Sequence, residues 1–205
     1  MSRIACLCLL QSFLLFGSSF ADDDFVPDSA TKVKYDFAQW CKVGDYTFAL
    51  EGNTTLADVI KALGGGAIER ISAFGDADPE WAVDYTDGSH LIRFSCDSDM
   101  GGENHDLLSV EIIAPTGSEK IANLPSLRLP IAFQFGSAKM SFLDITKALG
   151  SAVITRGTAW YEYSGKKPIK DSLGKILDYD VLGTLQVKVV GGKIVALTLS
   201  RVFSY

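Results

Sequence analysis

The chain has 205 residues, is 47% hydrophobic and carries a formal net charge of −6 at pH 7. Phosphate backbones repel an acidic chain, so we expect no nucleic-acid partner. Beyond the N-terminus no apolar run approaches the roughly 18 residues that a membrane-spanning helix needs, so we expect no transmembrane span.

The first 21 residues are typical of a signal peptide. Arg3 precedes an apolar run from Ile4 to Phe16, and small residues at Ser19 and Ala21 precede three aspartates. This pattern predicts cleavage after Ala21 and export of the mature chain. We therefore expect a periplasmic or secreted protein.

Two of the four cysteines lie inside the predicted signal peptide, which leaves Cys41 and Cys96. A cysteine pair in an oxidising compartment predicts a disulfide, and its loop would contribute about 3–4 kcal/mol to the free energy of unfolding. Two isolated cysteines make a poor metal site, because the other ligands would have to come from elsewhere. We expect neither a metal nor a cofactor.

One segment of the chain is written twice. Residues 55–64 (TLADVIKALG) recur as residues 141–150 (SFLDITKALG). In each copy a Thr or Ser is followed three residues later by Asp, which predicts a capping box at the start of a helix. Apolar residues then recur at helical spacing, and a glycine ends each copy where a left-handed residue is needed.

Strand-like segments follow each predicted helix. They are Trp81–Tyr85, His90–Cys96 and Leu108–Ala114 in the first copy, and Ala159–Tyr163, Thr184–Val190 and Lys193–Arg201 in the second. The sequence 86–89 (TDGS) predicts a turn, and Gly191-Gly192 predicts a two-residue hairpin turn. These elements predict an α+β protein of two tandem repeats, each a helix followed by an antiparallel β-meander. The first repeat with its N-terminal lead would span residues 22–114, a linker 115–130, and the second repeat 131–205.

The pattern of 52–55 (GNTT) before the helix, a Leu-Gly helix end and then 81–85 (WAVDY) resembles the SmpA/OmlA outer-membrane lipoprotein family. Two such units in one exported chain resemble the beta-lactamase inhibitory proteins. The resemblance implies helix-plus-meander units and either an envelope assembly role or inhibition of another protein. The lipidated cysteine of the SmpA/OmlA family has no counterpart here.

Four aromatic residues recur at matched places after the two helices: Trp81, Tyr85, Trp160 and Tyr163. Aromatic side chains on a rigid sheet are frequent anchors of protein recognition, so we take these four as candidate binding residues. The alternative is that they pack beneath the helices. Strand alternation places Trp81, Val83 and Tyr85 on one face, and Tyr161 on the face opposite to Trp160.

No motif in the sequence assembles a catalytic group. The chain has two histidines, and it lacks the Gly-x-Ser-x-Gly turn of serine hydrolases. We therefore expect a non-enzymatic protein-binding module, an inhibitor or immunity protein whose partner is another, basic protein. The alternatives are an envelope assembly factor and a hydrolase whose site includes Asp76 and His90.

Overall fold

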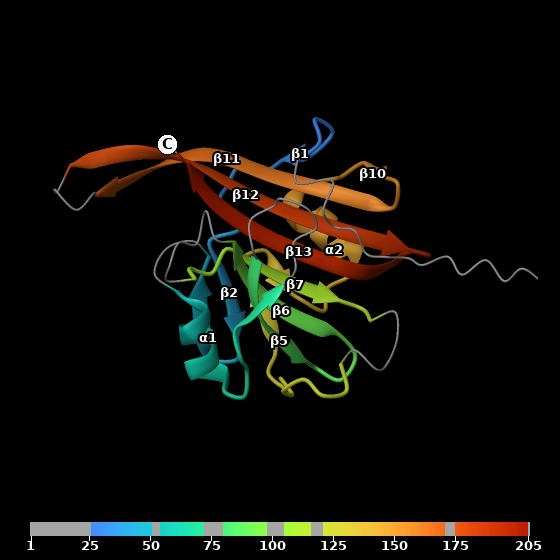
Figure 1. Ribbon diagram of the computed structural model, residues 1–205. Coiled ribbons are helices and arrows are strands. Elements are labelled where there is room, and N and C mark those ends of the chain that lie inside the picture. The colour runs from blue at the N-terminus through green and yellow to red at the C-terminus, as the bar shows by residue number, and fades with distance from the viewer. Residues whose placement is uncertain are drawn as a thin grey trace, which may run out of the picture.

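The computed structural model describes residues 26–50, 54–71, 80–97, 105–115, 121–170 and 175–204. The predicted signal peptide and Asp76 lie outside these residues. Within them the chain forms thirteen strands in two sheets and two helices of eight residues each (Figure 1).

Both helices begin as the sequence predicts. The helix α1 (Leu56–Leu63) starts at a capping box in which the Thr55 hydroxyl accepts from the backbone N–H of Asp58 at 3.2 Å. The helix α2 (Phe142–Leu149) starts at Ser141, whose hydroxyl accepts from the N–H of Asp144 at 3.3 Å. In each box the carboxylate reaches back to the N–H of the capping residue, so two otherwise unpaired donors are satisfied.

The larger sheet has nine strands in the order β1-β11-β12-β13-β7-β6-β5-β4, with β10 also paired to β11. Its pairs are antiparallel except for β1 with β11. The strands are β1 (Thr31–Lys32), β4 (Glu69–Ile71), β5 (Glu80–Thr86), β6 (Leu91–Asp97), β7 (Ser109–Ile113), β10 (Ile154–Thr155), β11 (Thr158–Lys170), β12 (Ile176–Val190) and β13 (Lys193–Ser204).

The second sheet has four strands in the order β3-β2-β8-β9. Its strands are β2 (Trp40–Val43), β3 (Tyr46–Ala49), β8 (Ile131–Phe133) and β9 (Gly136–Ser137). They come from the segments that lead into the two helices, which the sequence marks only by short apolar runs.

The predicted α+β fold class of two tandem helix-plus-meander repeats is wrong. Strands make up 53% of the described residues and helices 11%, so the protein is mostly β. The strands also do not form two meanders side by side, because β7 and β13 pair antiparallel and unite the nine strands in one sheet. The lead-in strands β2 and β8 likewise pair with each other. The predicted units could not remain separate, since each would leave an unpaired edge strand at this seam.

One hydrophobic core lies between the larger sheet and the layer made by the helices and the smaller sheet. Its fully buried members include Leu56 and Ile145 of the helices, Phe94 and Leu199 of the larger sheet, and Phe133 of the smaller one. Residues of the predicted linker also pack against the body: Leu127 is buried, and its N–H donates to the Thr86 carbonyl at 2.7 Å.

The predicted disulfide is absent. Cys41 and Cys96 are both buried, and no disulfide joins them in the described part of the chain. Cys41 lies in β2 of the smaller sheet, whereas Cys96 lies in β6 of the larger one, with its sulfur 3.7 Å from Nδ1 of His105.

Candidate functional site

The two faces of the larger sheet differ in chemistry. Strand alternation directs Val83, Phe94, Val110, Leu199 and Leu185 toward the core, where all five are fully buried. Their neighbours along each strand point to the opposite face and are mainly polar. We call this opposite face, from β5 to β11, the polar face.

Directly paired residues form two rows across the polar face. One row joins six strands and consists of Asp84, Arg93, Glu111, Thr198, Gln186 and Trp160. The other consists of Ala82, Ser95, Ser109, Ser200, Thr184 and Glu162, and it continues to Lys32 of β1.

Small hydroxyl side chains pair along the second row. The Ser95 and Ser109 hydroxyls lie 2.6 Å apart, and so do those of Thr184 and Ser200. These residues join β6 to β7 and β12 to β13. The second row therefore consists mainly of short, hydrogen-bonded side chains, beside the longer side chains of the first row.

A charged cluster occupies the β5–β7 end of the polar face. Arg93 donates from Nε to Oδ1 of Asp84 at 2.8 Å and from NH2 to Oδ2 at 2.9 Å. Such a two-point contact fixes the guanidinium more firmly than a single ion pair. These hydrogen bonds also raise the pKa of Arg93, although burial opposes them.

Glu111 lies directly opposite Arg93 on the neighbouring strand. Burial raises the pKa of Glu111 to about 7, and the nearby carboxylates of Glu80 and Asp84 add to this rise, while the positive charge of Arg93 opposes it. The cluster therefore changes charge near neutral pH.

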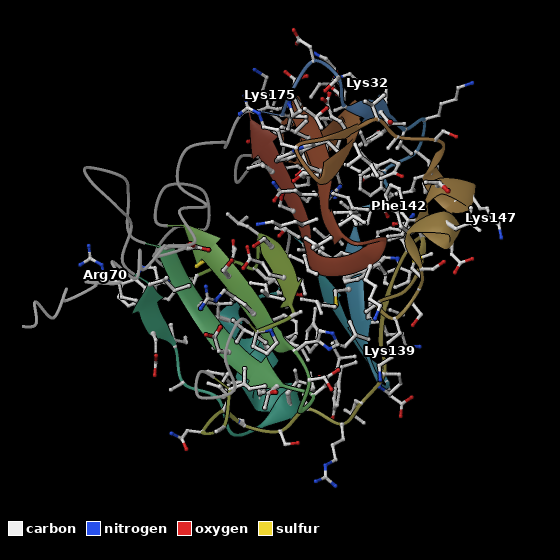
Figure 2. The ribbon with its side chains drawn as sticks, turned by 90° about the vertical axis from the view of Figure 1, so that its right-hand side faces the viewer. Lys32, Arg70, Lys139, Phe142, Lys147 and Lys175 are labelled. Carbon is white, nitrogen blue, oxygen red and sulfur yellow. The ribbon has the colours of Figure 1, made fainter. Side chains whose placement is uncertain are left out.

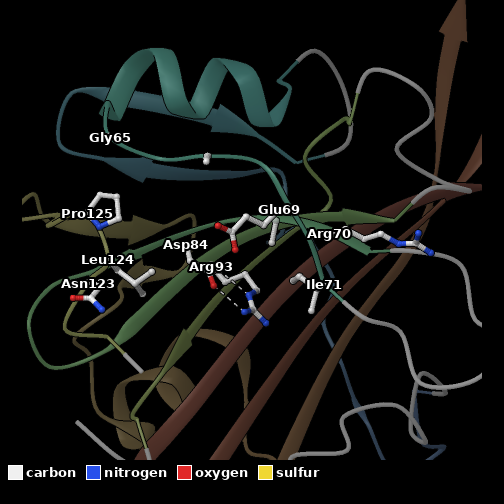
Figure 3. Close-up of a pocket in the computed structure, with 11 residues that line it drawn as sticks. Gly65, Glu69, Arg70, Ile71, Asp84, Arg93, Asn123, Leu124 and Pro125 are labelled. Carbon is white, nitrogen blue, oxygen red and sulfur yellow. Dashed lines mark hydrogen bonds and ion pairs between the residues drawn. The ribbon is translucent and has the colours of Figure 1, made fainter. Parts of the chain in front are cut away.

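A hollow of about 410 Å³ opens beside this cluster. Figure 3 shows the Asp84–Arg93 contact with Glu69 on one side and residues 123–125 on the other. Arg70 points away from the pair. The walls carry both charges, so the hollow suits polar groups rather than an apolar ligand.

The four candidate aromatic residues do not form one surface. Tyr85 is 1% exposed and belongs to the core. Trp81 and Tyr163 are half-buried and pack against the core from the same side of the sheet, Trp81 with its ring 4.9 Å from that of His105. Trp160 alone lies on the polar face, opposite Gln186.

Sequence alternation placed these rings correctly relative to one another, with Trp81, Val83 and Tyr85 sharing a face and Tyr161 opposite to Trp160. It did not identify Arg93, Glu111, Thr198 and Gln186 as members of a common surface. Charged residues that alternate with apolar ones, Arg93 in β6 and Glu111 in β7, are the sequence signal that marks that surface.

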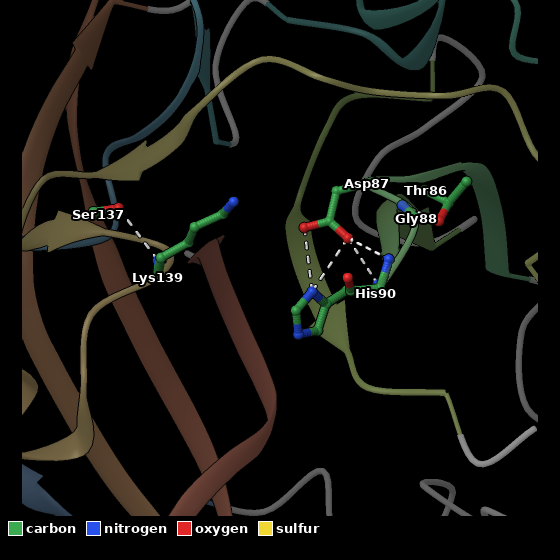
Figure 4. A network of polar contacts seen from close by, with 7 residues as sticks. Thr86, Asp87, Gly88, His90, Ser137 and Lys139 are labelled. Carbon is green, nitrogen blue, oxygen red and sulfur yellow. Dashed lines mark hydrogen bonds and ion pairs between the residues drawn. The ribbon is translucent and has the colours of Figure 1, made fainter.

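His90 belongs to a turn. The Asp87 carboxylate accepts from the N–H groups of Ser89 and His90, each at 2.8 Å, and also contacts the His90 ring at 3.2 Å (Figure 4). These hydrogen bonds lower the pKa of Asp87 even though burial opposes them. In the same view, the hydroxyl of Ser137 accepts from the N–H of Lys139 at 3.2 Å. Asp87 and His90 thus stabilise the hairpin between β5 and β6.

Within the described ranges, no group of three or more His, Cys, Asp or Glu side chains could hold a metal ion. No helix in the described part of the chain is long and apolar enough to cross a membrane. Comparison of the chain with known protein families, with curated proteins and with solved structures finds no match.

Proposed function

We propose that the chain is an exported, non-enzymatic protein-binding module that holds a basic partner protein on the polar face of its larger sheet. The observation that carries this proposal is the continuous row from Asp84 to Trp160, which spans six strands on the side away from the core. A paired antiparallel sheet presents such a row rigidly, so binding costs little ordering of the backbone.

The charges of the polar face favour a basic partner. It carries the acids Glu80, Asp84, Glu111 and Glu162 and the bases Arg93, Lys32 and Lys188. Arg93 is paired with Asp84, and Lys32 is paired with Glu162. The acids in excess, together with the acidic chain as a whole, attract a positively charged protein surface and speed its association.

Trp160 supplies the aromatic anchor. It is half-buried in the polar face beside the uncharged polar residue Gln186. A tryptophan within a polar surface combines a large apolar contact area with an N–H donor, which is the usual chemistry of a binding hot spot. An inhibitor or immunity protein of an exported enzyme or toxin needs such an anchor and a charged rim, and no catalytic group.

The test compares two variants that add the same charge on opposite sides of the molecule. Gln186→Lys places a cation in the row of the polar face, whereas Leu143→Lys places one on α2, at a side chain that is 62% exposed. For a partner captured from the exported fraction, we expect Gln186→Lys to weaken binding at least tenfold and Leu143→Lys to change it less than twofold. Equal affinities of the two folded variants would reject the polar face as the binding surface.

A further inference from the structure

A second cavity lies on the other side of the larger sheet, away from the polar face. It has a volume of about 530 Å³ and opens where β11–β13 pass β2 and β3 of the smaller sheet. Figure 1 shows the β11–β12 hairpin reaching beyond the body of the protein at this end. A cavity of this size matches sites for small organic ligands.

The floor of the cavity is a buried ion pair. Arg201, 4% exposed, donates from NH2 to Oδ2 of Asp36 at 2.6 Å, and from NH1 to the Leu50 carbonyl at 3.1 Å. The other carboxylate oxygen of Asp36, Oδ1, is buried and has no hydrogen-bond partner among the described residues. A buried carboxylate oxygen without a donor costs free energy, so the site favours a ligand that brings an N–H or O–H group.

Two aromatic side chains contribute to the walls of the cavity. Trp40, at the start of β2, and Tyr163, in β11, both line the cavity and are half-buried. Val181 also lines the cavity and is 2% exposed. Two aromatic side chains around a gap of this size favour a planar ring system.

The rim is positive in an otherwise acidic protein. Lys166 and Lys167 line the opening, and both are exposed. Lys166 lies 3.6 Å from the carboxylate of Asp180, whereas Lys167 lies over the ring of Phe203 at 5.0 Å. Arg201 and Asp36 neutralise each other, and Asp180 offsets the charge of Lys166, so Lys167 sets the sign of the site, which favours an anion.

We propose that this cavity binds a small aromatic anion, a carboxylate or sulfonate whose ring system carries a hydrogen-bond donor. The anionic group lies at Lys166 and Lys167, the rings lie between Trp40 and Tyr163, and the donor faces Asp36. This site is separate from the polar face and does not depend on the protein partner.

The probe for the test is 8-anilinonaphthalene-1-sulfonate, which combines a sulfonate, fused rings and an N–H group. The readout is the indole N–H signals in a ¹⁵N spectrum, because the chain has three tryptophans and only Trp40 lines the cavity. We expect saturable binding of one probe molecule per chain, with a shift of the Trp40 signal and little change at Trp81 and Trp160.

A matched pair of double variants tests the role of the charges. Lys166→Gln with Lys167→Gln should raise the dissociation constant at least tenfold. Lys139→Gln with Lys147→Gln removes two exposed cations at and near α2 (Figure 2) and should leave it within twofold. Equal loss in both double variants, equal shifts of all three indole signals, or no saturable binding of the probe to the folded chain would overturn the proposal.

Discussion

Glu111 lies directly opposite Arg93 in the larger sheet, yet the guanidinium of Arg93 donates two hydrogen bonds to Asp84 on the other side. The guanidinium of Arg93 thus lies between the carboxylates of Asp84 and Glu111, and it forms its hydrogen bonds with Asp84. Glu111 receives only its more distant attraction, which explains why burial governs the pKa of Glu111.

Replacing Arg93 should raise the pKa of Glu111 further. In Arg93→Met the positive charge that favours the ionised carboxylate is gone, while the burial and the acidic neighbours remain. A ¹³C titration of the Glu111 carboxyl should therefore place its pKa above about 7. An unchanged or lower pKa would show that Arg93 does not act on Glu111.

Glu111 should make the protein less stable as the pH rises through neutrality. Its pKa is about 7 in the folded chain against an ordinary value of 4.5, so the folded state holds the extra proton between these values. The free energy of unfolding should fall by on the order of 2–3 kcal/mol from pH 5 to pH 8. Denaturant titrations at both pH values check this, and Glu111→Gln should remove most of the decline. If Glu111→Gln shows the same decline, other groups cause it.

The two capping boxes should contribute similar stability. Thr55→Ala and Ser141→Ala each remove the hydroxyl that accepts from the third residue of the helix, and each should lower the free energy of unfolding by about 1 kcal/mol. Leu143→Ala is the control, because this exposed helix residue should cost under about 0.5 kcal/mol. Chemical denaturation measures all three, and a loss in the control as large as in the cap variants would contradict the assignment.

The buried ion pair of Asp36 and Arg201 should be much more costly to break than to replace. Asp36→Ala leaves the guanidinium of Arg201 buried without its carboxylate and should destabilise the fold by about 3–5 kcal/mol. Asp36→Ala combined with Arg201→Met removes both charges and should recover a substantial part of that loss. If the double variant is less stable than Asp36→Ala, the attraction between the two charges stabilises the fold by more than their burial destabilises it.

Cys41 and Cys96 should titrate as two free thiols after denaturation without reductant. In the folded protein both should react slowly with a thiol reagent, because both are buried and burial raises the pKa of Cys41. Zero reactive thiols in the denatured chain would show that the disulfide forms after all.

Local signals in the sequence predicted the local structure well. The bounds of both helices were predicted to within a residue from the capping residues Thr55 and Ser141 and the terminal glycines. The hairpin between β12 and β13 was predicted from Gly191-Gly192. Each of these features depends on hydrogen bonds or backbone angles within a few residues, which the sequence displays directly.

The way the strands join could not be predicted in the same manner. Pairing of β7 with β13 and of β2 with β8 connects residues far apart in the chain, and no residue in these strands encodes its partner. The same limit applies to the polar face. Alternation showed that Trp160 and Tyr161 point to opposite sides, but only the long-range pairing brings Trp160 into one row with Glu111 and Arg93.

Docking of a basic partner on the polar face is tested most directly by site-specific cross-linking in the producing cells. A photoreactive benzoylphenylalanine replaces Gln186 in one strain and Leu143 in another. We predict an adduct with one protein of basic surface from position 186 only, and its loss when Glu111→Lys and Glu162→Lys reverse the local charge in a folded chain. An adduct with the same protein from position 143 alone, or an adduct at 186 that survives the charge reversal, would contradict docking on the polar face.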